Sequence, residues 1–432
     1  LFGKKYNENM TGSEGTTRAL GAVATLGYSY DYRYSADFNI RIDGSSQFGK
    51  DNRFAPFWSA GLRWNMKKES WLRNVKWVDD VVLRASYGVT GTQGFSPYQS
   101  RSVYTYTNLM KPYFSSNATG TELVALGNSN LKWQQTGTWN VGLELSLLKG
   151  RFTTRAEYYI KNTKNSLAQI TLAPSVGFAS YKDNLGEIEN KGLELNLRGV
   201  LLKDADRRMQ WDVFFNIVKN KNRLMKLNDA LAAYHKSQDD EMNGEIEEGK
   251  TRAPMVRYQE GKSINMIWAN ESIGIDPNTG EEVFIALNGD KVNKWSTDNY
   301  KPLGCSDPKF EGNFGTMFMY KGWELNAHLY YKYGGYIYNQ TLVDKVENVN
   351  PNENGDRRIL YDRWNEPGDV AKFKKVSDVS VTNPTSRFVE KENYIQLQAL
   401  SVSYDFRSAK LKEWGIQRLK ISAIGNDVFT SS

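Results

Sequence analysis

Cysteine, histidine and long apolar runs are nearly absent from this sequence. The single cysteine, Cys305, excludes an internal disulfide and a cysteine-based zinc site. The two histidines, His235 and His328, are too few to build a histidine-centred metal or catalytic site. No apolar run reaches the roughly 18 residues that a membrane-spanning helix needs. We therefore expect no resident metal, no cofactor and no helical membrane anchor.

Proline is scarce, and basic and acidic residues are intermixed along the chain. The 432 residues include 11 prolines against 36 glycines, which argues against a low-complexity linker protein. The net charge is +7, but 56 basic residues are spread along the chain beside 49 acidic ones. No dense basic run marks a nucleic-acid surface, so no nucleic-acid partner is expected.

Large amphipathic rings are abundant in a chain that is polar on average. Aromatic residues make up 13%, with 25 tyrosines and 12 tryptophans, while the mean hydropathy is −0.61. A soluble chain of this length would normally divide into two or three domains. The chain begins without a methionine and stops within a strand-like stretch, so we interpret it as a fragment of a longer protein.

The stretch from Asn140 to Ile160 predicts a hairpin of two long strands. Apolar side chains alternate with polar ones on both sides of a tight turn at Lys149-Gly150. The same alternation recurs along the chain and indicates roughly a dozen strands, with apolar positions near 22–30, 38–42, 58–64, 81–87, 193–197, 211–217, 323–331, 395–406 and 419–423. Its phase slips between Gln398 and Leu400, which predicts a β-bulge. Only residues 67–75 suggest a helical turn.

The connections between the predicted strands alternate between short and long. Tight turns fall near residues 32–33, 149–150, 203–208 and 321–322, and long loops span about 90–134, 163–190, 220–312 and 334–392. Membrane barrels follow this rule, because their short turns face the periplasm and their long loops face outside. Tyr28, Tyr30, Tyr32 and Trp139 suit the aromatic girdles at the two interfaces. We therefore predict an all-β, transmembrane antiparallel β-barrel; soluble antiparallel sandwich domains remain the alternative.

Several stretches match a known family in its order along nearly the whole chain: Asp31–Leu72, Leu83–Gly94 ("LRASYGVTGTQG"), Asn128–Leu167, Val176–Gly199 with its "NLGEIENKG", Gly274–Asp290, Asp307–Asn339 and Glu392–Phe406. The chain thereby resembles the SusC/RagA-type TonB-dependent transporters of Bacteroidetes outer membranes. Cys305 departs from the family pattern, because a small or polar residue is usual there.

The resemblance implies part of a barrel of about 22 strands with a plugged lumen. The family's N-terminal extension, its plug domain and the first and last parts of the barrel are not in this sequence. The resemblance also implies a SusD-like surface lipoprotein as partner, the TonB–ExbB–ExbD complex as energy source, and oligosaccharides or peptides as imported nutrients. No enzymatic step is expected.

Two sets of residues are candidates for function. Aromatic rings in the long loops could stack on the apolar faces of a sugar, or could instead pack the loops together: Tyr98, Tyr104, Tyr106, Trp268, Trp295, Tyr300 and Trp364. Charged residues on the predicted lumen face are candidates for contact with a plug: Arg41, Arg63, Arg84, Glu144, Arg155, Glu157, Glu194 and Arg198.

No catalytic or metal-binding pattern stands beside these sets. The acidic stretch Asp239–Lys250 resembles a calcium loop, but Lys250 occupies the position of the closing glutamate. Three other interpretations stay open at this point. They are a passive outer-membrane porin, a β-barrel enzyme, which would need a convergent catalytic set, and a soluble carbohydrate-binding β-sandwich protein.

Overall fold

One antiparallel sheet of 12 strands dominates the protein. The computed structural model describes residues 15–94, 98–108, 119–171, 178, 180–184, 186–227, 235–236, 238–240, 242–244, 251–348, 356–378, 380–407, 411 and 413–431. Within them, each strand of the sheet pairs with the next one along the chain, in the order β1 (Ala19–Tyr30), β2 (Tyr34–Ser45), β3 (Phe54–Asn65), β4 (Val78–Thr92), β7 (Gln134–Leu147), β8 (Phe152–Lys164), β11 (Gly186–Asp204), β12 (Met209–Leu227), β17 (Phe310–Tyr320), β18 (Trp323–Tyr338), β19 (Val389–Phe406) and β20 (Leu419–Ser431).

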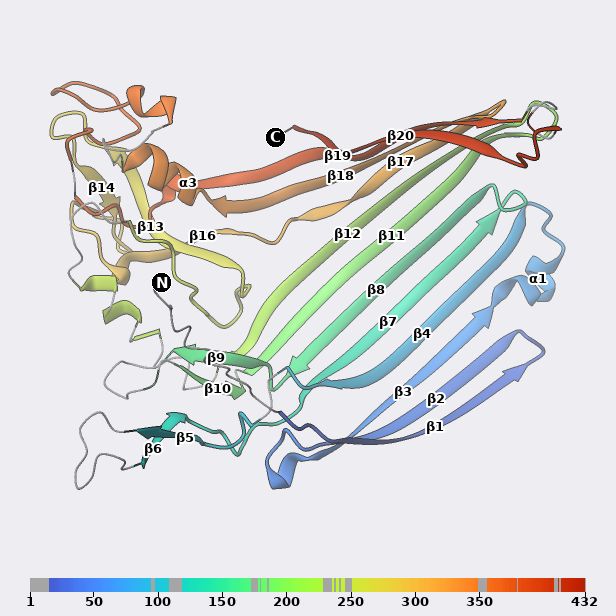
Figure 1. The fold of residues 1–432 in the computed structure, drawn as a ribbon, viewed down its shortest axis with the longest axis horizontal. Coiled ribbons are helices and arrows are strands. Elements are labelled where there is room, and N and C mark those ends of the chain that lie inside the picture. The colour runs from blue at the N-terminus through green and yellow to red at the C-terminus, as the bar shows by residue number, and fades with distance from the viewer. Residues whose placement is uncertain are drawn as a thin grey trace, which may run out of the picture.

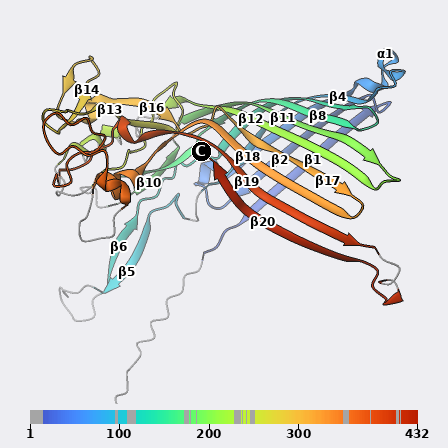
Figure 2. The same ribbon diagram turned by 90° about the horizontal axis from the view of Figure 1, so that it is seen from above.

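The sheet curves but does not close within this chain, because β1 and β20 are its two outermost strands (Figures 1 and 2). All the short turns lie at one end of the strands and the long connections at the other (Figure 1). The all-β antiparallel architecture predicted from alternation is confirmed. Among the described residues, no helix is both long and apolar enough to cross a membrane.

The two faces of the sheet differ in chemistry. The strand register places Leu143 opposite Ala156 and Leu83 on one face, and Glu144 opposite Arg155 on the other. The apolar face is exposed over its whole width, and its exposed side chains include Leu26, Tyr28, Leu62, Trp139, Val141, Tyr158, Leu193, Leu325 and Ile421. An apolar surface of this extent is unstable in water, so it must face lipid. The charged face is then the lumen face.

Glycines allow one tight turn and one close approach within the sheet. In the turn between β7 and β8, Gly150 has a φ of +74° and follows Leu148 and Lys149, which also have positive φ. Gly192 on β11 lies under the ring of Tyr159, where an added Cβ would sit 2.2 Å from a ring carbon. The glycine of the "ENKG" motif therefore makes room for an aromatic side chain of the neighbouring strand.

Two local predictions are confirmed. The register of β19 against β20 shifts between Leu397 and Ala399, at the predicted phase slip. The short helix α1 (Ser70–Arg73) lies in the stretch where a helical turn was expected, at the short-turn end of β3 and β4.

The long connections contain strands of their own. Two hairpins, β5 (Val103–Asn108) with β6 (Thr119–Ala125) and β9 (Leu167–Thr171) with β10 (Ser180–Asn184), follow β4 and β8. The connection between β12 and β17 forms a four-stranded sheet of β13 (Met266–Ile275), β14 (Glu282–Ile285), β15 (Lys291–Val292) and β16 (Tyr300–Cys305). Short helical turns, including α3 (Gln340–Leu342) and the π-turn at Val343–Glu347, follow β18. That these connections face outside the cell stays a prediction.

The buried apolar clusters lie at the long-connection end, not beneath the sheet. One cluster gathers Phe48, Ala55, Phe57, Leu131 and Trp133. Trp133 stacks on Phe48 at 4.4 Å between ring centroids, and its indole nitrogen donates to the carbonyl of Asn52 at 3.0 Å. Two of the stretches that carry the family resemblance, Asp31–Leu72 and Asn128–Leu167, thus meet in this cluster. Their packing holds the loop after β2 against the start of β7.

Candidate functional site

The lumen face carries a row that crosses five neighbouring strands and has charged side chains on four of them. Register aligns Arg63 on β3 with Arg84 on β4, Arg84 with Gly142 on β7, Gly142 with Glu157 on β8, and Glu157 with Glu194 on β11. Because Gly142 has no side chain, the long side chain of Arg84 can extend toward the acidic residues beyond it. The row therefore brings together residues that lie far apart in the sequence.

Four of the predicted lumen residues form one ring of alternating charge. Arg84 binds Glu144, and Arg155 binds Glu157. The ring closes through longer contacts of 3.9 Å, from Arg84 to Glu157 and from Arg155 to Glu144. The four side chains retain 16–50% of their exposure, so they are paired with one another yet open to the lumen. A half-exposed network of this kind adds little stability by itself.

A groove of about 500 Å³ adjoins this charge ring on the lumen face. Glu144 and Arg155 form one side of it, and Asn196, Arg198 and Phe214 form another. Both signs of charge, amides and one aromatic ring are thus available to a polar segment lying against the wall.

The remaining four lumen candidates are outside the ring of ion pairs, although two of them are aligned with its members. Arg41 pairs with Asp43 on its own strand at 2.7 Å, and Arg198 reaches Asp212 on β12 at 3.2 Å. Arg63 is exposed and faces Arg84 across the register, while Glu194 is half-buried opposite Glu157. The structure thus places all eight lumen candidates on the sheet, and contact with a plug stays a prediction.

The loop aromatic residues divide into exposed rings and rings that pack between loops. On β5, Tyr104 is 62% exposed and Tyr106 is 83% exposed. Tyr98 is also exposed, at 46%, and its hydroxyl accepts a hydrogen bond from the backbone of Thr16 at 3.1 Å. These three rings are accessible to a ligand in the chain described here.

The other four rings pack the loops. Trp268 and Tyr300 are 6% and 7% exposed, and burial raises the pKa of Tyr300 well above its usual value. The indole nitrogens of Trp295 and Trp364 donate to the carbonyls of Pro384 and Pro277, at 3.1 and 2.9 Å. Packing between loops, the alternative role left open by the sequence, accounts for these four side chains in this conformation.

The two longest connections form one folded unit. We call it the loop assembly, and it consists of the β13–β16 sheet together with residues 340–348, 356–378 and 380–388. Asn270 on β13 pairs with Thr385 in a parallel bridge, and its backbone amide donates to Pro384 at 3.2 Å. Val343, Val346, Phe373 and Phe388 form the apolar core on the second connection.

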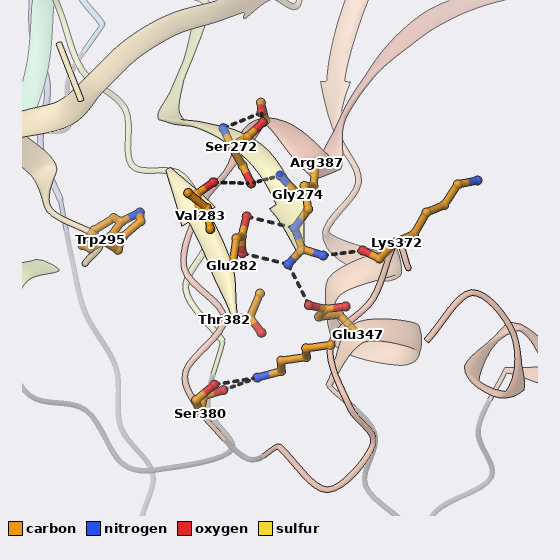
Figure 3. Close-up of polar contacts among 12 residues, drawn as sticks. Ser272, Gly274, Glu282, Val283, Trp295, Glu347, Lys372, Ser380, Thr382 and Arg387 are labelled. Atoms are coloured by element: carbon orange, nitrogen blue, oxygen red, sulfur yellow. Dashed lines mark hydrogen bonds and ion pairs between the residues drawn. The ribbon is translucent and has the colours of Figure 1, made fainter. Parts of the chain in front are cut away.

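A buried ionic cluster joins the two halves of the loop assembly (Figure 3). Arg387 forms a forked pair with Glu282 on β14, at 2.9 and 2.8 Å, and reaches Glu347 at 2.7 Å. Its side chain is 11% exposed, and that of Glu347 is fully buried. Burial alone would lower the pKa of Arg387, but the two carboxylates outweigh it and hold that pKa above its usual value. No sequence motif signals this cluster.

In the part of the chain that the structure describes, no group of three or more histidine, cysteine, aspartate or glutamate side chains could hold a metal ion. Much of the acidic stretch 239–250 lies outside the described residues. His235 accepts a hydrogen bond from the backbone of Tyr258 at 3.0 Å, and burial lowers its pKa.

Comparisons with known proteins agree with this geometry. The family model described as "TonB dependent receptor-like, beta-barrel" matches residues 2–270. TonB-dependent receptor P39 of Formosa agariphila is 27% identical, over 99% of this chain and 44% of its own length. TonB-dependent receptor SusC of Bacteroides thetaiotaomicron is 35% identical, over 47% of this chain and 20% of its own length. The chain thus spans less than half the length of these relatives.

Solved structures share the fold. The RagAB peptide transporter aligns with a TM-score of 0.81 at 20% identity, covering 96% of this chain and 44% of that one. The RagAB peptide importer in its "closed-closed" state aligns with a TM-score of 0.79 at 21% identity, covering 96% and 44%. At these identities the likeness concerns the arrangement of strands.

Proposed function

Because the chain belongs to the TonB dependent receptor-like β-barrel family, we propose that its parent protein imports oligosaccharides or peptides across the outer membrane, powered by the TonB–ExbB–ExbD complex. The chain itself is a segment of an outer-membrane β-barrel. The observation that carries the proposal is the sheet with two unlike faces, apolar outside and charged inside, with folded loops at one end. The name of the similar RagAB peptide transporter supports the peptide class, and the oligosaccharide class rests on the family resemblance of the sequence.

The partner in this proposal is a SusD-like surface lipoprotein that caps the long-loop end. The loop assembly supports it, because a folded unit of this size offers a rigid surface where a mobile loop would not. We propose that the exposed rings of Tyr98, Tyr104 and Tyr106 contact substrate or the cap. A passive porin would need neither the cap nor energy coupling.

The test is a mild-detergent purification of the intact parent protein from outer membranes, with mass spectrometry of everything retained. We expect a large surface lipoprotein to co-purify, together with a barrel chain that extends N-terminally through a plug. Recovery of a bare barrel, with neither plug nor partner, would contradict energised import and leave the porin.

Charge reversal in the lumen is expected to impair uptake. The substitution Arg155→Glu places a third carboxylate beside Glu144 and Glu157, leaves Arg84 as the only cation of the ring, and creates like-charge repulsion across the strands. We expect substrate uptake to fall several-fold while the protein still inserts, because the change disturbs the wall that the plug contacts. Uptake by whole cells, normalised to barrel abundance in the membrane, measures it.

The matched control for this prediction is the swap Arg155→Glu with Glu157→Arg, which keeps the ring neutral. We expect the swap to restore most of the uptake. If the single reversal leaves both uptake and plug retention unchanged, the predicted contact between this ring and a plug is wrong.

Truncation of the exposed rings is expected to weaken ligand binding at the long-loop end. Replacing Tyr104 and Tyr106 together by alanine removes two stacking surfaces, and we expect a several-fold rise in the Kd for the imported oligomer. Isothermal titration of the purified complex with candidate oligosaccharides and peptides measures it. The control is Tyr32→Ala, which removes an equally exposed ring at the opposite end of the barrel. Equal affinities for all three proteins would exclude these rings from binding.

A further inference from the structure

The short-turn end of the barrel has a groove with an excess of positive charge. We call it the rim groove; its volume is about 430 Å³. It lies where the β11–β12 turn, the β17–β18 turn and the end of β19 meet, on the side of the molecule opposite the loop assembly (Figure 1). Its charged lining residues are the cations Lys203, Arg208, Lys321, Arg407 and Arg418 and the carboxylates Asp204, Glu324 and Asp405.

The carboxylates of the rim groove are already engaged by other cations. Asp204 pairs with Arg207 at 3.6 Å, and Glu324 pairs with Lys420 at 2.7 Å. Asp405 accepts both Arg407, at 3.1 Å, and Arg418, at 3.5 Å. The other three cations of the groove are not part of these pairs.

Those three cations are Lys203, Arg208 and Lys321, and all are exposed. Within the described ranges, none of them has a carboxylate at salt-bridge distance. The backbone amide of Lys321 donates to the carbonyl of Arg208 at 3.2 Å, so the two turns are tied together and hold their cations side by side. Three exposed cations at one rim favour an anionic ligand.

Aromatic rings next to the groove fix its depth in the membrane. Trp323 is 56% exposed, and its ring lies 4.9 Å from that of Tyr404, on the same apolar face of the sheet as Leu325. The amine of Lys321 lies over the ring of Tyr320, at 5.2 Å. Exposed tryptophan and tyrosine at a strand end mark the headgroup level of the bilayer. The cations just beyond the rings therefore lie at the level of the lipid phosphates.

From this arrangement we propose that the rim groove binds the headgroup of an anionic phospholipid from the periplasm-facing leaflet of the outer membrane. Arg208 and Lys321, in the turns beyond the strand ends, hold the phosphate, and Trp323 contacts the glycerol and upper acyl region; Lys203 is aligned with Gln210 on the lumen face and is left out of the contact. The inference rests on the orientation of the barrel in its membrane and is independent of transport. An acidic protein segment or a free phosphate would match the positive charge of the groove, but neither would account for the exposed aromatic rings beside it.

The test compares lipid retention by the full-length protein in nanodiscs of phosphatidylethanolamine containing a minor share of phosphatidylglycerol. After mild detergent extraction, the lipids that remain bound are quantified by mass spectrometry. We expect wild type to enrich phosphatidylglycerol over its share in the disc. The variant Arg208→Gln with Lys321→Gln is expected to lose that enrichment, at about five-fold per cation removed. The conservative variant Lys321→Arg should keep it.

The control variant Lys149→Gln with Arg151→Gln removes two cations from a different short turn, and we expect it to retain the enrichment. Inorganic phosphate at millimolar concentration should not displace the lipid. Enrichment that survives in the Arg208 and Lys321 variant, or is lost equally in the control, would overturn the site. Displacement by inorganic phosphate would show a simple anion site without lipid recognition, which also overturns the proposal.

Discussion

Replacing Arg387 by methionine is expected to unfold the loop assembly while the barrel stays folded. The change leaves the carboxylates of Glu282 and Glu347 buried beside each other without their shared cation. Removing one partner of a buried ion pair costs about 3–5 kcal/mol. Because every contact of Arg387 lies within the loop assembly, this loss should appear as local opening and not as global unfolding.

Hydrogen exchange of the intact protein in detergent measures the effect, peptide by peptide. We expect faster exchange in residues 266–305 and 356–388 and unchanged protection in β7 and β8. Arg358→Met is the matched control, because its pair with Asp356 is largely exposed and should contribute under about 1 kcal/mol.

A rescue variant tests whether the stranded carboxylates cause the opening of the loop assembly. Adding Glu282→Gln and Glu347→Gln to Arg387→Met removes the buried charges that the single substitution strands. We expect protection of the loop assembly to recover in part, since an uncharged cluster lacks the desolvation penalty. If the single variant exchanges like wild type, the ionic cluster does not hold the two connections together.

Arginine on the outer face is expected to disrupt insertion far more than arginine on the inner face. Val141, near the middle of β7, lies on the exposed apolar face between Ala85 and Tyr158. Val141→Arg should cost about 2–4 kcal/mol, the range for a cation at the bilayer midplane on the lipid face of a barrel.

Asn140→Arg is the control for this second prediction, because Asn140 precedes Val141 on the same strand and points to the lumen between Ser86 and Tyr159. Denaturant unfolding of the full-length barrel in lipid vesicles compares the two variants. We expect a clear loss of stability for Val141→Arg and a change below about 1 kcal/mol for Asn140→Arg. Equal losses would mean that the assignment of faces is wrong.

Alternation predicted the barrel strands because lipid outside and water inside impose opposite chemistry on successive residues. Strand β17 is not apparent by this signal, because its lumen face carries Gly315, Met317 and Met319 where other strands carry charges and amides. The phase slip at the β19 bulge could be predicted from the sequence, because apolar and polar residues alternate clearly in the segments on both sides of it.

The loop assembly could not be predicted by the same reasoning. Its residues face protein on several sides, so no regular period survives, and strands such as β14 are four residues long. Trp268 and Tyr300 are good candidates for binding by residue type alone, yet they lie inside this small sheet. The Arg387–Glu282 pair spans 105 residues, a distance at which pattern reasoning has no information.

The pairing of every barrel strand with its neighbour in sequence also sets an order of assembly. The hairpins that close over the short turns pay little loop entropy, whereas β12 with β17 and β18 with β19 pair across the long connections. The loop assembly joins segments that are brought close only after β17 and β18 have paired with β12 and β19. The ionic cluster of the loop assembly should therefore form last. Protection of the loop assembly from hydrogen exchange should then show that this part of the barrel sheet is complete.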